Sequence, residues 1–407
     1  RIVDPATGEP LDEAMVSVQR APRTYTRENT VEVYCHGGSL LLRRVTALFL
    51  RLGARPADPG EFTRRAFLNG RISLSQAEAV LDLIRAKTEA AQRAAMAQLD
   101  GGLHQAVVRL RGQAVRLLAE IEAGIDFVEE DIVFLSEDRQ RTAVEGLMDQ
   151  ADALLKTARG GRVLREGVAT AIIGRPNVGK SSLLNALLRQ NRAIVTPIPG
   201  TTRDVIEEVL NLDGLPLRIM DTAGLRNAED AVEREGISRA YRAMEQADLI
   251  LIVLDAEQAV KGLTRDEIDF IRKAENKPQV LILNKLDLLP AGWKQSAAIK
   301  SIQNALPISA LTGEGLERLR AEIASLIRSG IVSCGEQEAM INERHQSALL
   351  RAREAFFQVA GSIGKGVGPE VVAADLRSAI DRLGELTGDA TTEDLLDSIF
   401  RDFCIGK

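Results

Sequence analysis

The stretch that decides the fold reads ATAIIGRPNVGKSSLLN over residues 169–185. It joins an apolar strand to a helix through GRPNVGKS (174–181), which fits the phosphate-binding pattern G-x-x-x-x-G-K-[ST]. In that pattern the backbone N–H groups and the helix N-terminus face the phosphates of a nucleotide. Lys180 would reach the outer phosphates, and the Ser181 hydroxyl would ligate Mg²⁺. The stretch therefore predicts a nucleotide-binding α/β domain.

The motif DTAG (221–224) follows a second predicted strand at 217–220. This position places the Asp221 carboxylate near Mg²⁺ and the N–H of Gly224 near the γ-phosphate. Taken alone, a D-x-x-G pattern is a weak indication, and it gains weight from its place after the phosphate loop.

The motif NKLD (284–287) follows a strand predicted at 280–283 and indicates which base is bound. The Asp287 carboxylate can accept from both the ring N–H and the exocyclic amine of guanine, a donor pair that adenine lacks. Asn284 can connect the base to the phosphate loop, and the backbone after Ser309 can donate to the guanine carbonyl. These residues predict GTP or GDP as the ligand.

The segment TPIPGTTRD (196–204) lies where GTPases keep a switch loop, and Thr202 is the candidate to complete the Mg²⁺ shell with Ser181. Leu225 follows DTAG, where a glutamine would orient the attacking water in Ras-like enzymes. A leucine cannot polarise water, so another group must do so. We expect the following residues to contact GTP or GDP: Asn177, Val178, Gly179, Lys180, Ser181, Ser182, Thr196, Pro197, Ile198, Pro199, Gly200, Thr201, Thr202, Asp221, Thr222, Ala223, Gly224, Asn284, Lys285, Asp287, Ser309, Ala310 and Leu311.

The spacing of apolar residues along the sequence divides the chain into four segments. Strand-like alternation over 14–35 and an apolar helix over 39–52, ended by Gly53, indicate an α+β domain at 1–71. Helical spacing dominates 72–165 and returns over 329–407, with a glycine-rich loop predicted at 361–369. Between them, 166–328 alternates strands with helices in the βαβ manner, as in a Ras-like P-loop GTPase domain with a mostly parallel sheet. We therefore predict a GTPase domain inserted into an all-α helical domain.

The composition of the 407-residue chain limits its expected binding partners and cellular compartment. The net charge of -6 argues against broad binding to polyanions, although a local basic surface could hold an RNA. Three cysteines far apart suggest neither a disulfide framework nor a zinc site. No apolar run is long enough to span a bilayer, and the start does not resemble a signal peptide, so the expectation is a cytoplasmic protein. The opening resembles the middle of a fold, and we expect an N-terminal portion to be missing.

The chain resembles the MnmE (TrmE) family of tRNA modification GTPases along its whole length. The resemblance is carried by CHGG (35–38), PGEF (59–62), RAFLNG (65–70), QAEA (76–79), PGTTRD (199–204) and the ending FCIGK (403–407). It implies a homodimer formed through the N-terminal domains, whose GTPase domains meet across a K⁺ ion. Carried over by position, K⁺ would be held by the Asn177 side chain, the carbonyls of Thr196 and Ile198, and Thr201, while Glu233 would orient the water. From the sequence alone, Glu233 is one more charge on a helix.

The resemblance also implies a second ligand and further partners. A tetrahydrofolate one-carbon derivative would be bound by the N-terminal domain at Glu32, Arg71 and Lys407. With an FAD-containing MnmG-type protein, in a heterotetramer or larger complex, such proteins place an aminomethyl or carboxymethylaminomethyl group on carbon 5 of the wobble uridine of tRNA. For Cys404 two interpretations stay open: a packed structural thiol, which we favour because no His or Lys can be assigned beside it, and a nucleophilic or folate-proximal thiol. His36 and His345 are interpreted as ordinary polar residues.

Two other interpretations stay open at this point. A ribosome-assembly GTPase of the Era and Der kind shares the nucleotide motifs but carries an RNA-binding module such as a KH domain after them, and no KH-type G-x-x-G follows here in a βαα context. A non-catalytic scaffold that binds GTP only to control assembly is disfavoured by the complete Mg²⁺ and phosphate motifs.

Overall fold

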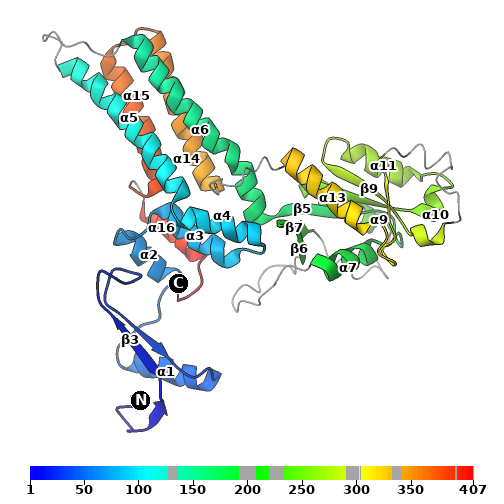
Figure 1. The fold of residues 1–407 in the computed structure, drawn as a ribbon, viewed down its shortest axis with the longest axis horizontal. Helices are drawn as coiled ribbons and strands as arrows, with labels where there is room; N and C mark the ends of the chain where they lie inside the picture. Colours follow the sequence, from blue (N-terminus) through cyan, green and yellow to red (C-terminus); the bar gives the residue numbers. More distant parts are fainter. Residues whose placement is uncertain are drawn as a thin grey trace.

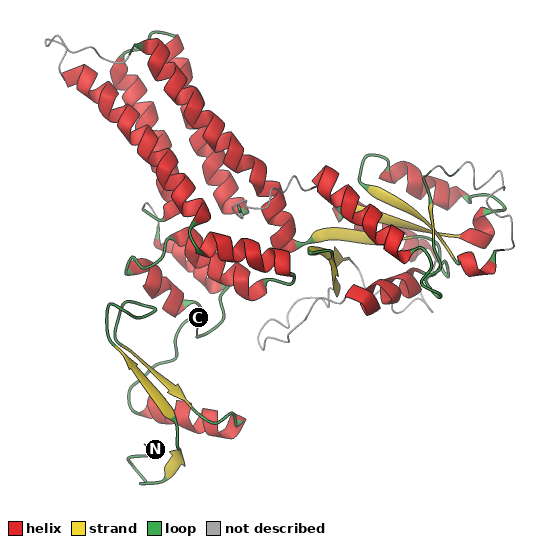
Figure 2. Ribbon diagram, viewed as in Figure 1, coloured by secondary structure: helices red, strands yellow, loops and turns green. Residues whose placement is uncertain are grey.

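The computed structural model describes residues 1–126, 136–191, 208–220, 233–289, 302, 304–331, 341–389 and 392–406. Figure 1 shows three parts: a small N-terminal part, a bundle of long helices, and an α/β part to one side of the bundle. Figure 2 shows that the strands lie in the first and third parts, whereas the bundle is helical. Within the described residues, none of the helices is both long and apolar enough to cross a membrane.

The N-terminal part consists of two short antiparallel pairs and a helix. Its elements are β1 (Ile2–Val3), β2 (Pro10–Asp12), β3 (Met15–Gln19), β4 (Thr30–Tyr34) and α1 (Ser39–Arg51). The predicted alternation is present, because β3 and β4 pair with Val16 opposite Val33 and Val18 opposite Val31. Helix α1 ends where Gly53 takes a left-handed φ of 99°, which suits a residue without a Cβ.

The helical part draws on both sides of the α/β segment. Its elements are α2 (Glu61–Leu68), α3 (Leu74–Arg85), α4 (Glu89–Leu99), α5 (Gly102–Asp126), α6 (Glu137–Glu166), α14 (Glu343–Gly364), α15 (Pro369–Thr387) and α16 (Glu393–Arg401). Helices α5, α6, α14 and α15 bury one apolar core, to which Leu103, Val107, Phe356 and Leu376 contribute. The loop predicted at 361–369 is wrong in its first half, because α14 continues to Gly364 and buries Ile363 in that core.

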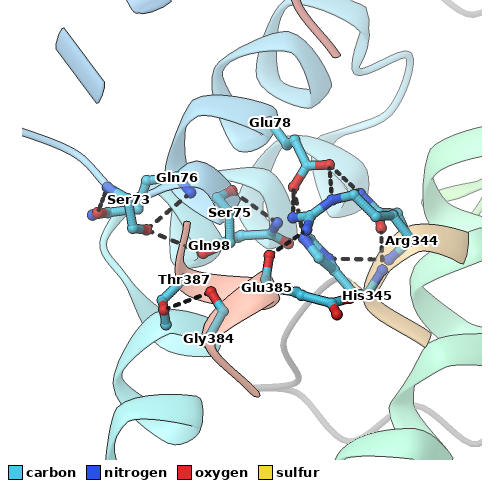
Figure 3. Close-up of polar contacts among 11 residues, drawn as sticks. Ser73, Ser75, Gln76, Glu78, Gln98, Arg344, His345, Gly384, Glu385 and Thr387 are labelled. Atoms are coloured by element: carbon cyan, nitrogen blue, oxygen red, sulfur yellow. Dashed lines mark hydrogen bonds and ion pairs between the residues drawn. The ribbon is translucent and has the colours of Figure 1, made fainter. Parts of the chain in front are cut away.

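A buried ionic cluster joins the early helices to the late ones. The Glu78 carboxylate on α3 accepts two hydrogen bonds from Arg344, at 2.9 and 2.7 Å, and lies 2.6 Å from Nε2 of His345 at the start of α14. Arg344 also donates to the carbonyl of Glu385 on α15 at 2.9 Å. Figure 3 shows the Glu78 side chain pointing toward Arg344 and His345, with Glu385 of α15 beside them. His345 is fully buried, and its partner is a carboxylate from a segment more than 260 residues away.

The α/β part is built on a mixed sheet. Its elements are β5 (Val168–Ile173), α7 (Lys180–Asn191), β6 (Glu208–Leu212), β7 (Leu215–Ile219), α9 (Glu233–Gln246), β8 (Leu249–Asp255), α10 (Ala256–Ala259), α11 (Arg265–Ala274), β9 (Gln279–Asn284), the 3-10 turn η1 (Leu286–Leu288), β10 (Leu306–Pro307), α13 (Leu316–Leu326) and a π-helical turn η3 (Ile327–Ile331). The strand order is β10-β9-β8-β5-β7-β6. All neighbours pair in parallel except β6, which is antiparallel to β7.

Two apolar cores cover the two faces of this sheet. Leu183 of α7 and Leu319 of α13 lie in one core, and Met244 of α9 and Phe270 of α11 lie in the other. The sheet follows directly on α6: only Gly167, with φ 81°, separates the helix from β5. A Cβ on Gly167 would lie 2.9 Å from the carbonyl of Pro216, so a side chain at that junction would press against β7.

Candidate active site

The phosphate loop runs from the carboxyl end of β5 to the start of α7. Gly174 and Gly179 have φ values of 151° and 96°, and Asn177, exposed at the bend, has a left-handed φ of 62°. A Cβ at Gly174 would overlap the carbonyl oxygen of Val253, and a Cβ at Gly179 would overlap the amide nitrogen of Asn284. Both glycines are therefore required by close packing as well as by backbone conformation. The resulting cradle of backbone at a helix N-terminus is the arrangement that accepts phosphates.

The Lys180 side chain curls back into this loop. Its ammonium donates to the carbonyls of Gly174 at 2.9 Å and Arg175 at 2.7 Å. Burial lowers the pKa of the Lys180 ammonium, because removal from water disfavours the charged form. A phosphate at the loop would supply the negative charge that favours the ammonium, in addition to the two carbonyl dipoles.

Asn284 ties the phosphate loop to the loops that would hold the base. Its side-chain nitrogen donates to the carbonyl of Val178 at 2.9 Å, and its side-chain oxygen accepts from the N–H of Ala310 at 3.0 Å. Asn284 is only 2% exposed, so both hydrogen bonds are shielded from water. The structure thus brings together three predicted site segments: 177–182, 284–287 and 309–311.

Asp287 faces the third of these segments. The Ser309 hydroxyl donates to a carboxylate oxygen of Asp287 at 2.5 Å and accepts from the N–H of Thr312 at 3.2 Å. The hydrogen bond from Ser309 fixes one carboxylate oxygen of Asp287. Leu311, two residues after Ser309, has a largely exposed side chain. The carboxylate is acceptor-only when ionised, which suits a ligand that offers two N–H donors.

Several predicted site residues lie outside the described residues. They are Thr196, Pro197, Ile198, Pro199, Gly200, Thr201, Thr202, Asp221, Thr222, Ala223, Gly224 and Lys407. Glu233 begins α9, and its side chain is likewise not described. Their roles remain predictions.

Comparison with known proteins gives the family. The family model described as the MnmE helical domain matches residues 74–404, and the one described as the GTP-binding protein TrmE N-terminus matches residues 1–71. The tRNA modification GTPase MnmE of Thermoanaerobacter pseudethanolicus is 44% identical over 408 aligned residues, covering 100% of this chain and 88% of that relative. The chain belongs to the MnmE family. The protein of the same name from Symbiobacterium thermophilum is 47% identical, with 98% of this chain and 87% of that relative covered.

Several solved structures are similar to part of the chain. Era of Aquifex aeolicus bound to GDP and aluminium fluoride is 27% identical and covers 46% of this chain and 65% of that one, with a TM-score of 0.29.

Two residues of the N-terminal part that are predicted to bind a folate derivative, Glu32 and Arg71, have different hydrogen-bond partners. Glu32 on β4 accepts a hydrogen bond from the Tyr34 hydroxyl. Arg71 donates to the carbonyl of Thr24 at 3.0 Å, and its guanidinium lies 4.9 Å from the centre of the Tyr25 ring. The two charges are thus each held by neighbouring residues of the N-terminal part.

Two of the motifs that resemble the MnmE family, PGEF (59–62) and FCIGK (403–407), contact each other in the structure. Pro59 forms an antiparallel bridge with Ile405, and the N–H of Gly60 donates to the carbonyl of Cys404 at 3.3 Å. A Cβ on Gly60 would lie 2.9 Å from Phe403, so the glycine allows the C-terminal segment to pack there. Cys404 is a free, half-buried thiol in this contact.

One charged residue beside Lys285 was not predicted from the sequence. Asp255, the last residue of β8, lies 2.7 Å from the ammonium of Lys285. The sequence places Asp255 at the end of an apolar run, but its pairing with Lys285 follows from the register of β8 against β9, which only the structure shows.

Proposed function

We propose that the chain binds guanine nucleotide with Mg²⁺ and hydrolyses GTP as a step in tRNA modification. The observation that carries the proposal is the Asn284 side chain, which bonds to Val178 of the phosphate loop and to Ala310 of the base loop. A residue in that position couples the phosphate end of a nucleotide to its base end.

The base is selected by the Asp287 carboxylate. Guanine offers a ring N–H and an exocyclic amine, which the carboxylate can accept, whereas adenine lacks this donor pair and would leave Asp287 with the Ser309 hydroxyl as its hydrogen-bond partner. A site built around such a pair discriminates strongly, because the wrong base leaves acceptor capacity of the carboxylate unpaired.

The phosphate loop supplies the positive field for the phosphates. Two glycines without room for a Cβ leave backbone N–H groups at the start of α7, and Lys180 adds an ammonium. Ser181 and Thr202 would hold Mg²⁺, with Asp221 close by, and the ion neutralises phosphate charge when bound.

Hydrolysis in this proposal depends on K⁺ because Leu225 cannot orient water. The exposed Asn177 amide, together with Thr196, Ile198 and Thr201, would hold the ion, whose charge replaces that of an arginine finger. An amide oxygen and backbone carbonyls are the oxygen donors that hard cations prefer. Two copies of the chain would bring their GTPase domains together, and Glu233 would orient the attacking water.

The tRNA chemistry is proposed from family membership. The chain would act as a homodimer in the cytoplasm with an FAD-containing MnmG-type partner, on carbon 5 of the wobble uridine. A tetrahydrofolate derivative bound at Glu32, Arg71 and Lys407 supplies the one-carbon unit; the Arg71 guanidinium, beside the Tyr25 ring, suits an anionic folate. GTP hydrolysis would gate a conformational step rather than form the new bond.

The test is turnover by the full chain in matched K⁺ and Na⁺ buffers, with Asp287→Asn alongside. We expect faster GTP hydrolysis in K⁺, and we expect Asp287→Asn to exchange GTP binding for xanthosine triphosphate binding. Equal rates in the two salts would refute the K⁺ mechanism. Unchanged GTP affinity in Asp287→Asn would refute the assignment of the base site.

A further inference from the structure

Asp255 is a buried carboxylate that belongs to none of the four nucleotide motifs. Its side chain is 8% exposed, and one carboxylate oxygen lies 2.7 Å from the Lys285 ammonium, whose side chain is 31% exposed. The other oxygen accepts from the N–H groups of Glu257 at 2.9 Å and Gln258 at 3.4 Å, at the start of α10. The Asp255 carboxylate thus makes two separate interactions: an ion pair with Lys285 and a helix cap at the start of α10.

The position of Asp255 beside the base motif is fixed by strand register. In the parallel pair of β8 and β9, Asp255 lies opposite Asn284. The next residue, Lys285, has a left-handed φ of 67°, a conformation that residues with a Cβ seldom adopt. This turn sets the path of the chain from Asn284 to Asp287.

The helix that Asp255 caps, α10, also contacts the phosphate loop. Helix α10 carries Gln258, whose side-chain oxygen accepts from the Arg175 guanidinium at 3.4 Å. Asp255 therefore contacts the base motif through its ion pair and the phosphate loop through the helix that it caps.

We propose that Asp255 is a positioning residue for guanine nucleotide, which acts by holding the Lys285 side chain and thereby the turn that presents Asp287. The ion pair fixes a long, flexible side chain and compensates its charge next to the base site. Without it, the Lys285 ammonium becomes free to approach Asp287, the carboxylate that must stay available to the base. This inference rests on the proposed guanine specificity and names a residue on which that specificity depends.

Two substitutions separate the duties of Asp255. Asp255→Asn removes the charge that pairs with Lys285 but keeps a good helix-capping side chain, whereas Asp255→Ala removes both. Asp213→Asn is the matched control, since Asp213 pairs with Arg320 at 3.3 Å in the turn between β6 and β7 of the same sheet.

The measurement is the affinity and dissociation rate of a fluorescent GDP on the full chain, together with KM and kcat for GTP. We expect Asp255→Asn to weaken GDP binding about 10-fold, equal to about 1.4 kcal/mol, mainly through faster dissociation. We expect KM to rise by the same factor with kcat little changed, and Asp213→Asn to bind like the wild type. Without nucleotide, the melting temperature should fall less for Asp255→Asn than for Asp255→Ala, because the asparagine keeps the helix cap and loses only the ion pair with Lys285.

A double substitution tests the route through Lys285. If Asp255 acts through this lysine, Asp255→Asn adds no further loss of affinity in a Lys285→Gln background. Additive losses, or wild-type GDP affinity in Asp255→Asn, would overturn the inference. Failure of the wild-type chain to bind GDP would instead overturn the proposed function, so the two failures are distinguishable.

Discussion

Replacement of Glu78 by glutamine tests what holds the two stretches of the helical part together. Glu78 is the anion of a buried cluster with Arg344 and His345, and its side chain is 11% exposed. Although burial opposes ionisation, the charge and hydrogen bond of His345 and the contacts of Arg344 hold the pKa of Glu78 well below its ordinary value. Glu78→Gln keeps the size of the side chain and removes its charge.

The expected loss is large because the partners stay buried. Removing one member of a buried ion pair costs about 3–5 kcal/mol, since the remaining charge loses its compensation. For a unit of 150–250 residues, about 1 kcal/mol shifts the melting temperature by about 2–4 °C. We therefore expect the helical transition to move down by roughly 10 °C.

The assay is thermal unfolding followed by far-UV circular dichroism, with Asp152→Asn as control. Asp152 pairs with Arg353 at 3.0 Å between α6 and α14, but the two side chains are 40% and 36% exposed. An exposed pair of this kind contributes about 0–1 kcal/mol, so the control should melt within a few degrees of the wild type. Equal shifts in the two variants would refute the reasoning, because burial would then not decide the cost.

The same cluster gives a pH dependence with a defined sign. Since the pKa of Glu78 is lower in the folded state than in the unfolded chain, its contribution is complete above about pH 4.3 and is lost as the pH falls further. The difference in melting temperature between wild type and Glu78→Gln should therefore shrink as the pH falls below about pH 4. A difference that widened in acid would contradict the assigned direction.

Two further predictions concern the nucleotide site. Glu233→Ala should lower single-turnover GTP hydrolysis in K⁺ about 100-fold, or roughly 3 kcal/mol of barrier, while a fluorescent GDP titration gives wild-type affinity; wild-type turnover would leave Glu233 as an ordinary helix charge. Gly179→Ala should lower GDP affinity at least about 10-fold, because the added Cβ would displace the Asn284 amide, whereas Gly361→Ala, with open space around its Cβ, should bind normally. Normal binding by Gly179→Ala would show that the loops can shift without loss.

Those parts of the fold that depend on local pattern could be predicted from the sequence. The apolar strands that became β5 and β9 lie within one or two residues of their predicted positions, because a run of buried aliphatic residues between helices has few other interpretations. The phosphate loop could also be predicted from local sequence, because its glycines, Lys180 and Ser181 lie within eight consecutive residues. Strand β6 was missed, since its sequence EVLNL carries too few residues to separate a strand from a short helical turn.

Features that depend on contacts between distant segments could not be predicted. Glu78 and Arg344 are 266 residues apart, and nothing in either local sequence indicates that the two meet. Asp255 and Lys285 are closer, but their ion pair follows from the register of β8 against β9, which a single sequence does not determine. The end of α14 was placed too early because glycine is a poor helix former, yet Ile363 gains enough from burial to continue the helix.

Helix α6 belongs to both the bundle and the α/β part, and this has a mechanical consequence. Val144, Leu147 and Ala151 pack in the core of the bundle, whereas Val163 of the same helix packs in the core beneath the sheet. Beyond Val163, Arg165 pairs with the buried Asp82 of α3 at 3.2 Å, one turn along that helix from Glu78. Strand β5, which leads into the phosphate loop, begins two residues after α6 ends. A displacement of the phosphate loop strand relative to the bundle must therefore either bend α6 or separate Arg165 from Asp82, because no flexible linker lies between α6 and β5 to absorb it.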